Sequence, residues 1–212
     1  MKIPASLLKP NKDSTQFIVA IEGPDGVGKT SMCNLMAEKV EFSHQTLPAQ
    51  FNQYELKQRM IFEASWMASA FFFLSGVMET KREIDLNPAE THLMDRSFWS
   101  TLAVNWVKDP LRMPALLNLL DIAHAFIPIP NLIIILYASY EECKARSNSK
   151  MDHGKDLDRV SFEQYEKEIA YYHLLETSLP NVISVDTNGL NQQQVVEVVE
   201  EKIKGFKRRL EF

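Results

Sequence analysis

The chain has few cysteines, and this scarcity limits the classes of protein to which it can belong. Cys33 and Cys143 are the only two in 212 residues. Both fall in helical patterns, and they do not have the spacing of zinc ligands. The sequence therefore does not indicate a small disulfide scaffold, and we expect a reduced, cytoplasmic protein.

Long apolar runs are also missing. No stretch approaches the ~20 consecutive apolar residues that a membrane-spanning helix needs. Near the start of the chain, Leu7 and Leu8 form a short apolar pair that more polar residues follow, so the core of a signal peptide is absent. We expect residues 1–15 to be a loose leader to one domain that spans residues 16–212.

Positive charge is not in excess. The chain has 23 Lys and Arg against 28 Asp and Glu, which gives a net charge of −5. This balance disfavours a nucleic-acid backbone as the main partner. Basic residues do gather between Lys202 and Arg209, and we interpret them as the solvated face of a last helix. None of the five histidines has the spacing of a zinc ligand or lies in a nucleophile motif.

Glycine is scarce too, yet three of the seven glycines lie within six residues, at Gly23, Gly26 and Gly28. They belong to the pattern G-x-x-x-x-G-K-[ST], which Lys29 and Thr30 complete. An apolar run typical of a buried strand precedes the pattern, and helical spacing of apolar residues follows it. Strand, glycine turn and helix are the context of a phosphate-binding loop.

The residue types of this loop suit phosphate chemistry. Glycines let backbone amides approach phosphate oxygens, and the first turn of the next helix favours an anion. Lys29 is expected to bridge the β- and γ-phosphates of ATP, and the Thr30 hydroxyl to ligate Mg²⁺. The predicted phosphate-binding residues are Gly23, Asp25, Gly26, Val27, Gly28, Lys29, Thr30 and Ser31.

The rest of the chain alternates strands with helices. Further strands are predicted within residues 41–47, 91–95, 131–138 and 181–186, with helical patterns between them. This alternation predicts an α/β fold with three layers, α/β/α, around a five-stranded parallel sheet. The apolar residues 54–81 predict one or two buried helices. Their phenylalanines are core residues by default, and Phe71 and Phe72 are our candidates for contact with an acceptor.

In such a sheet, ligands bind beyond the carboxyl ends of the strands. Asp95 ends the third strand and can hold Mg²⁺ directly or through water, while Arg96 can contact an acceptor or the transferred phosphate. The polar residues 147–159 predict a mobile lid. Arg146 and Arg159 are our candidates for cations that stabilise the γ-phosphate as the lid closes. The predicted catalytic residues are Lys29, Arg96, Arg146 and Arg159.

Together these motifs resemble the thymidylate kinase family over roughly residues 16–205. The family's loop, E-G-x-D/E-G-x-G-K-T/S, is matched by residues 22–30, and its D-R-[YFS]-x-x-S by residues 95–100. Asp158 and Arg159, ahead of aromatic residues, match the end of the family's lid weakly. The resemblance implies a P-loop kinase fold, ATP as co-substrate with Mg²⁺, and a homodimer formed through long helices. It also implies that Asp25 binds the 3′-hydroxyl of the acceptor's sugar.

The chain departs from the family where the acceptor's phosphate is bound. Thr46, Leu47 and Pro48 stand where the family often has Arg-Glu-Pro. Leu74 or Ser75 is nearest to the position where the family has an arginine in the long helix. These departures leave the identity of the acceptor open.

Three functions follow. The first is an ATP-dependent nucleoside monophosphate kinase that acts on dTMP or a related (deoxy)nucleotide. The second is a deoxynucleoside kinase that phosphorylates a 5′-hydroxyl. The missing arginines favour it, but no glutamate lies between Leu47 and Glu55 to act as the general base, and Asp25 is uncommon in that class. The third is a nucleotide-binding module without turnover, against which the complete loop and Asp-Arg motif argue. We favour the first function.

Overall fold

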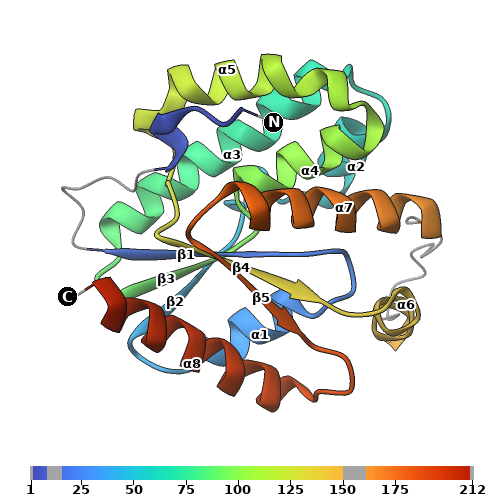
Figure 1. Ribbon diagram of the computed structural model, residues 1–212. Helices are drawn as coiled ribbons and strands as arrows, with labels where there is room; N and C mark the ends of the chain where they lie inside the picture. The colour runs from blue at the N-terminus through green and yellow to red at the C-terminus, as the bar shows by residue number, and fades with distance from the viewer. Residues whose placement is uncertain (1, 9–15, 150–160, 211–212) are drawn as a thin grey trace.

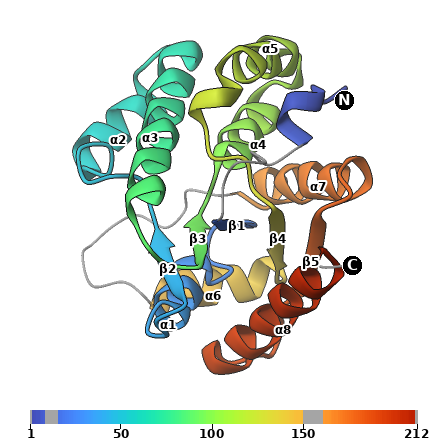
Figure 2. The same cartoon turned by 90° about the vertical axis from the view of Figure 1, so that its left-hand side faces the viewer.

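The computed structural model describes residues 2–8, 16–149 and 161–210. Its centre is one parallel sheet (Figure 1), and the strand order β2-β3-β1-β4-β5 can be followed from left to right in Figure 2. The strands are β1 (Phe17–Glu22), β2 (Phe42–Gln45), β3 (Thr91–Asp95), β4 (Leu132–Tyr137) and β5 (Val182–Asp186). The five-stranded parallel sheet predicted from the sequence is confirmed.

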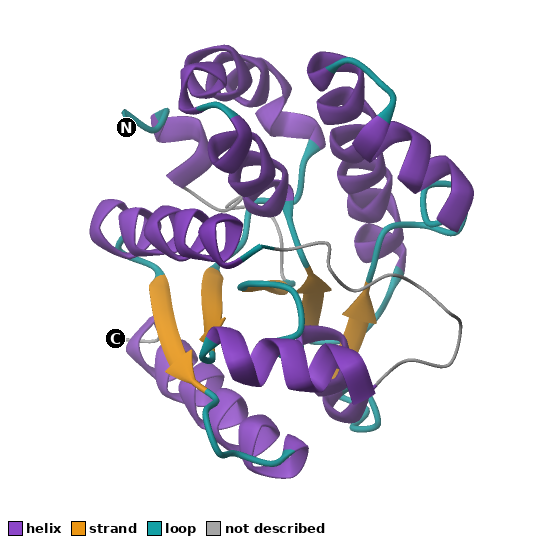
Figure 3. Ribbon diagram, turned by 90° about the vertical axis from the view of Figure 1, so that its right-hand side faces the viewer, coloured by secondary structure: helices purple, strands orange, loops and turns teal. Residues whose placement is uncertain are grey.

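Helices connect the strands, as Figure 3 shows by colour. They are α1 (Lys29–Met36), α2 (Tyr54–Phe62), α3 (Trp66–Leu86), α4 (Phe98–Lys108), α5 (Met113–Ala123), α6 (Tyr140–Ser149), α7 (Phe162–Ser178) and α8 (Gln192–Leu210), with short 3₁₀ helices η1 (Ala5–Leu8), η2 (Pro110–Arg112) and η3 (His124–Phe126). The apolar residues 54–81 therefore supply two helices, and Ser65 caps the second by accepting a hydrogen bond from the amide of Ala68.

The sheet is covered on both faces, which confirms the three-layer α/β/α prediction (Figures 1 and 2). Helices α3, α4, α5 and α7 pack on one face, and α1 and α8 on the other. Strand β1 shows why: Ile18 and Ala20 belong to the first core, while Val19 and Ile21 belong to the second. Because side chains alternate along a strand, an uninterrupted apolar run requires apolar partners on both sides.

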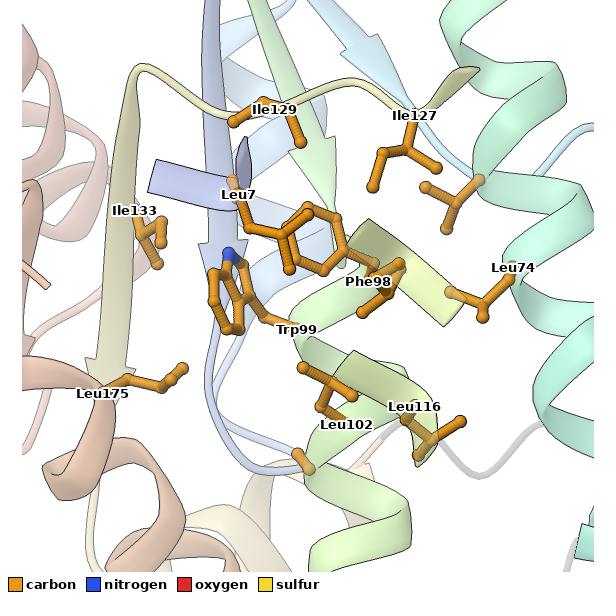
Figure 4. Close-up of a cluster of buried hydrophobic side chains, with 14 of the residues drawn as sticks. Leu7, Leu74, Phe98, Trp99, Leu102, Leu116, Ile127, Ile129, Ile133 and Leu175 are labelled. Carbon is orange, nitrogen blue, oxygen red and sulfur yellow. The ribbon is translucent and has the colours of Figure 1, made fainter. Parts of the chain in front are cut away.

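The first core extends to the start of the chain. Phe98 and Trp99 of α4 lie at its centre, with Leu7 beside them in Figure 4. Leu7 is only 3% exposed, and Ser6 donates a hydrogen bond to Asp121 of α5. The expectation of a loose leader is therefore wrong for residues 5–8, because η1 covers apolar surface that α5 and the sheet leave open. Residues 1 and 9–15 lie outside the described residues.

The predicted lid, residues 147–159, overlaps the end of α6. Ser147 and the two residues after it form the end of α6, and residues 150–159, with Arg159, lie outside the described part. After them, Ser161 caps the start of α7, where Ser161 and Gln164 form a reciprocal capping box. No helix in the described part combines the length and the hydropathy that a membrane span requires.

Candidate active site

The glycine loop connects β1 to α1 at the carboxyl edge of the sheet. Gly23 and Gly26 have φ angles of 132° and 84°, which side chains rarely adopt. A Cβ atom at Gly23 would lie 2.3 Å from the carbonyl oxygen of Leu136, and one at Gly26 would lie 2.2 Å from that of Cys143. The loop needs these glycines to pack against β4 and α6, in addition to any approach that they leave open for phosphate.

Lys29, the first residue of α1, lies over this loop. Its side chain is 5% exposed, and Nζ donates hydrogen bonds to the carbonyl oxygens of Gly23 at 2.8 Å and Pro24 at 2.7 Å. Burial and the nearby charge of Arg96 lower the pKa of Lys29, although the carboxylate of Asp25 opposes this effect. Lys29, the residue predicted to bind phosphate, therefore lies at the glycine loop.

Thr30 and Asp95 bring the two sequence motifs together. The Thr30 hydroxyl donates a 2.5 Å hydrogen bond to Asp95 Oδ2, and His44 Nε2 lies 3.8 Å from the same oxygen. Burial alone would raise the pKa of Asp95. Hydrogen bonding to His44 and Thr30, with the charges of Lys29 and Arg96, outweighs burial and lowers that pKa to about 2.

This pair fits a Mg²⁺ ion. Asp95 is ionised, and its second oxygen, Oδ1, is buried without a hydrogen-bond partner among the described residues. A hydroxyl and a carboxylate are hard oxygen ligands of the kind that Mg²⁺ prefers. The described residues hold no cluster of three or more His, Cys, Asp and Glu that could bind a metal by themselves. Mg²⁺ commonly completes its coordination with water and substrate phosphates, so a two-residue site is sufficient.

Arg96 follows Asp95 in an unusual backbone conformation. Its φ angle is 74°, in the left-handed region that costs a non-glycine residue roughly 1–3 kcal/mol. Its amide donates to the carbonyl of Ile21 at 3.1 Å, and its guanidinium donates to Asp25 Oδ1 and to Ser100 Oγ. The charge of Arg96 lowers the pKa of Asp25. Burial opposes the charge on Arg96, but the acidic groups around it, Asp25 foremost, together outweigh burial and raise the pKa of Arg96.

Glu22 is a residue whose role the sequence did not reveal. It is fully buried and accepts hydrogen bonds from the Ser97 amide at 2.9 Å, the Ser97 hydroxyl at 2.7 Å and the Ser100 hydroxyl. Burial raises the pKa of Glu22, and these hydrogen bonds oppose the rise. Glu22 therefore ties the end of β1 to the start of α4, which fixes Arg96 between them. The signal in the sequence that could have revealed this role was an acidic residue at the end of an apolar strand.

A cavity of about 680 Å³ extends from the loop between α2, α3, α4 and α7. Several of the predicted site residues line it together, namely Asp25, Gly26, Gly28, Lys29, Thr30, Asp95 and Arg96. Three residues that were also predicted to bind phosphate, Gly23, Val27 and Ser31, do not line it, and Val27 is buried in the second core. The glycine loop and the Asp-Arg motif thus share one end of a single cavity.

The two phenylalanines that the sequence suggested as acceptor contacts, Phe71 and Phe72, do not face the cavity. Phe71 is 49% exposed, and Phe72 packs against Phe51 and Phe73 with ring centroids 5.5 and 5.2 Å away. Neither lines the cavity, whereas Phe73 does. Successive residues of a helix point about 100° apart, so only one of three neighbours can face a given cavity.

The same helix brings no cation to the cavity. Leu74 is 1% exposed in the core, and the Ser75 hydroxyl donates to the carbonyl of Phe71 at 2.8 Å. The cavity residues of α3 are uncharged: Ser69, Ala70, Phe73 and Val77. Thr46 and Leu47, which follow β2, also line the cavity. The lysines that line it are Lys57 of α2 and Lys108 of α4, besides Lys29.

Arg146 does not line the cavity. Its guanidinium donates to the Thr187 hydroxyl at 2.9 Å, to the Thr187 carbonyl at 2.7 Å and to the Val27 carbonyl at 3.1 Å, and it pairs with Glu142 at 3.0 Å. These contacts place Arg146 behind the phosphate loop, where it joins the loop to the segment after β5. This position differs from the catalytic one expected from the sequence.

Glu168 of α7 lines the cavity and was not predicted. It accepts a 3.4 Å hydrogen bond from the hydroxyl of Tyr172, which is fully buried. Burial raises the pKa of Glu168 to about 7, although the charges of Arg96 and Lys29 oppose the rise. Its spacing of four from Gln164, another cavity residue, was a signal for a shared helix face, but the sequence did not show what that face meets.

Comparison with known proteins agrees with this architecture. The thymidylate kinase family model matches residues 21–203. The structure of thymidylate kinase from Candida albicans is similar, with a TM-score of 0.68, 22% identity, and coverage of 91% of this chain and 92% of that chain. No curated protein sequence matches significantly.

Deoxyadenosine kinase from M. mycoides is also similar. Its structure with the products dCMP and dCDP has a TM-score of 0.67 and 14% identity, covering 89% of this chain and 100% of that chain. Its structure with dATP has a TM-score of 0.65 and the same identity, covering 88% and 98%. At these identities the solved structures show a shared fold.

Proposed function

Because the chain belongs to the thymidylate kinase family, we propose that it transfers the γ-phosphoryl group of ATP to a nucleoside monophosphate, dTMP or a related deoxynucleotide. The family consists of phosphotransferases, and the chain has the fold and the phosphate loop of a nucleotide kinase. The observation that supports the proposal best is the meeting of Lys29, Thr30, Asp95 and Arg96 at one end of the cavity.

Each of these residues has a role in the proposal. Lys29 binds the β- and γ-phosphates of ATP, and Arg96 contacts the acceptor and the transferred group. Thr30 and Asp95 hold Mg²⁺, which neutralises phosphate charge when bound. Asp25, which also lines the cavity, binds the sugar of the acceptor.

The acceptor occupies the part of the cavity between α2, α3 and α4. Phe73 and Val77 give this part an apolar wall for a nucleobase, while Thr46, Ser100 and Thr101 supply hydroxyl groups. The role of Arg159 as a lid cation at the γ-phosphate stays a prediction from the sequence. The homodimer and the cytoplasmic location implied by the sequence also stay predictions, and sedimentation of the purified protein tests the first.

A deoxynucleoside kinase is the second candidate. The observation that favours it is the uncharged lining of the cavity by α3 and by Thr46 and Leu47. A kinase that phosphorylates a nucleoside needs no cations for an acceptor phosphate, but it benefits from a general base. No glutamate follows β2 at the expected place, so this candidate ranks second.

A panel of acceptors separates the candidates. ADP release is measured with ATP, Mg²⁺ and each of the deoxynucleoside monophosphates, ribonucleoside monophosphates and nucleosides. We expect turnover with at least one deoxynucleoside monophosphate. Turnover with nucleosides alone would overturn the first candidate. Tight ATP binding without transfer to any acceptor would instead support a module without turnover.

A further inference from the structure

Glu168 of α7 presents a carboxyl group to the substrate cavity, and few described groups form hydrogen bonds or ion pairs with it. The described residues give it one hydrogen bond, the 3.4 Å contact from the Tyr172 hydroxyl, and no ion pair. Helix α7 packs against α4, so Glu168 faces the cavity from the side opposite α3. Glu168 is partly exposed at the cavity, and a carboxyl group largely removed from bulk water is costly unless it is paired or protonated. This makes the group a candidate for contact with substrate.

The charged neighbours of Glu168 place it near the point of phosphoryl transfer. Asp25 and Lys29 act on it from the phosphate loop and α1, Arg96 from the turn before α4, and Tyr172 from its own helix. Ser97, the residue that caps α4, and Ser100 and Thr101 of α4 also line the cavity and are uncharged. Glu22 is enclosed by Ser97 and Ser100. Glu168 therefore shares the cavity end where Arg96 meets the acceptor.

We infer that Glu168 carries a proton when a nucleoside monophosphate is bound and donates a hydrogen bond from its carboxyl group to the acceptor's phosphate. The inference rests on the proposed function, because it requires a phosphorylated acceptor. It assigns to Glu168 part of the work that cations do elsewhere, at a site where α3 and the segment after β2 contribute none.

Electrostatics favours this state over an ionised one. A carboxylate beside the phosphates of ATP and acceptor would be repelled by both, and like charges raise the pKa of a carboxyl group. The pKa of Glu168 is already raised to about 7 by burial, so little further change is needed. A carboxylic acid that a buried site keeps neutral can donate a hydrogen bond, whereas a carboxylate can only accept one.

Proton uptake on binding tests the inference directly. The acceptor is the deoxynucleoside monophosphate with the fastest turnover in the panel, titrated calorimetrically with ADP and Mg²⁺ present, in buffers of different protonation enthalpy. The acceptor phosphate titrates near pH 6 and contributes its own protons. Subtracting the proton uptake of Glu168→Gln from that of the unmodified protein removes that contribution. We expect the difference to rise from near zero at pH 6 towards one proton at pH 8.

The variants give a second readout. Glu168→Gln keeps a donor without a titrating proton, so its affinity for the acceptor is expected to stay within about threefold at pH 7 and to lose the decline of the parent above pH 7. Glu168→Ala lacks the donor, and we expect its affinity for the acceptor to be at least tenfold lower at pH 6.5. Its affinity for ADP should be unchanged. Glu166→Gln, on the exposed side of α7, is the matched control and should resemble the parent.

The outcomes keep this inference apart from the proposed function. Equal proton uptake by the parent and Glu168→Gln, with turnover of a deoxynucleoside monophosphate retained, overturns the role of Glu168 alone. Loss of acceptor binding in Glu168→Gln overturns it too, because an ionised carboxylate would then be required. If the panel shows turnover with nucleosides only, the proposed function fails first and this inference with it.

Discussion

The hydroxyl of Thr30 and the carboxylate of Asp95 are joined by a 2.5 Å hydrogen bond, although 65 positions separate them in the chain. The sheet accounts for this: β1 and β3 are adjacent and parallel, with Ile21 opposite Asp95, so the segments after both strands leave at the same edge. The bond unites the glycine loop with the Asp-Arg motif, and the predictions below concern the site that they form.

Replacing Lys29 by alanine should lower turnover by ~10²–10³, because it removes positive charge from the site of the transferred phosphoryl group. ADP release at saturating ATP and acceptor measures the effect. Lys39→Ala is the control: Lys39 pairs with Glu200 of α8 and does not line the cavity, so its turnover should match that of the parent. Unchanged turnover in Lys29→Ala would mean that ATP binds elsewhere.

Asp95 should stabilise the fold in a pH-dependent way. Its pKa is about 2 in the folded protein against an ordinary 3.8, so its ionised form favours folding. This contribution is fully present above pH 4 and is lost as the pH falls from 4 towards 2. Urea unfolding of the parent and of Asp95→Asn across this range should show the parent losing roughly 2 kcal/mol more. If the free energies of unfolding of the two proteins fell in parallel over this pH range, a lowered pKa of Asp95 in the folded protein would be contradicted.

The same variant tests the metal site. With ADP present, Mg²⁺ should raise the Tm of the parent and leave that of Asp95→Asn nearly unchanged, because Asp95 Oδ1 is the buried oxygen without a partner. A rise of equal size in both proteins would place Mg²⁺ away from Asp95.

Gly26→Ala should destabilise the protein by about 2 kcal/mol or more and weaken ATP binding. The added Cβ would lie 2.2 Å from the Cys143 carbonyl, at a φ of +84°. Gly205→Ala in α8 is the control: no atom lies within 4 Å of its added Cβ, and alanine should stabilise that helix by up to ~1 kcal/mol. Thermal unfolding and ADP titration distinguish the two; a stable Gly26→Ala would show that α6 can move away from the loop.

Phe73→Ala should raise the KM for the acceptor by roughly 10-fold or more, since an aromatic wall of the cavity is lost. Phe71→Ala, two residues away, should change it by less than about twofold, because Phe71 is half exposed and outside the cavity. Steady-state kinetics with varied acceptor measure both. The reverse ranking would restore the assignment made from the sequence.

The two arginines around the lid should behave differently. Arg146→Ala should lower the Tm by roughly 2–8 °C and weaken ATP binding, because carbonyls of Val27 and Thr187 lose their donor. The kcat of Arg146→Ala at saturating ATP should change by a smaller factor than its affinity for ATP. Arg159→Ala should lower kcat more than it raises the KM for ATP. A change in KM alone would make Arg159 a binding residue.

The sequence alone determined the sheet and the phosphate loop, because both depend on local patterns. An apolar run followed by clustered glycines and Lys29 has few alternatives. The alternation of strands and helices then fixed a parallel sheet with its ligand site at the carboxyl edge. For the same reason the meeting of Thr30 with Asp95 was predictable.

Only the tertiary structure decided what depends on the rotation of a helix or on a distant partner. Packing of α3 turned Phe73 to the cavity and Phe71 to solvent, and packing of α7 against α4 turned Glu168 inward. Two carbonyl partners of Arg146 lie 41 and 119 positions away, and Leu7 packs in one core with residues distant in the sequence, Phe98 and Trp99. Periodicity shows that a helix has an apolar face, but the contacts between elements decide which residue of that face meets a ligand.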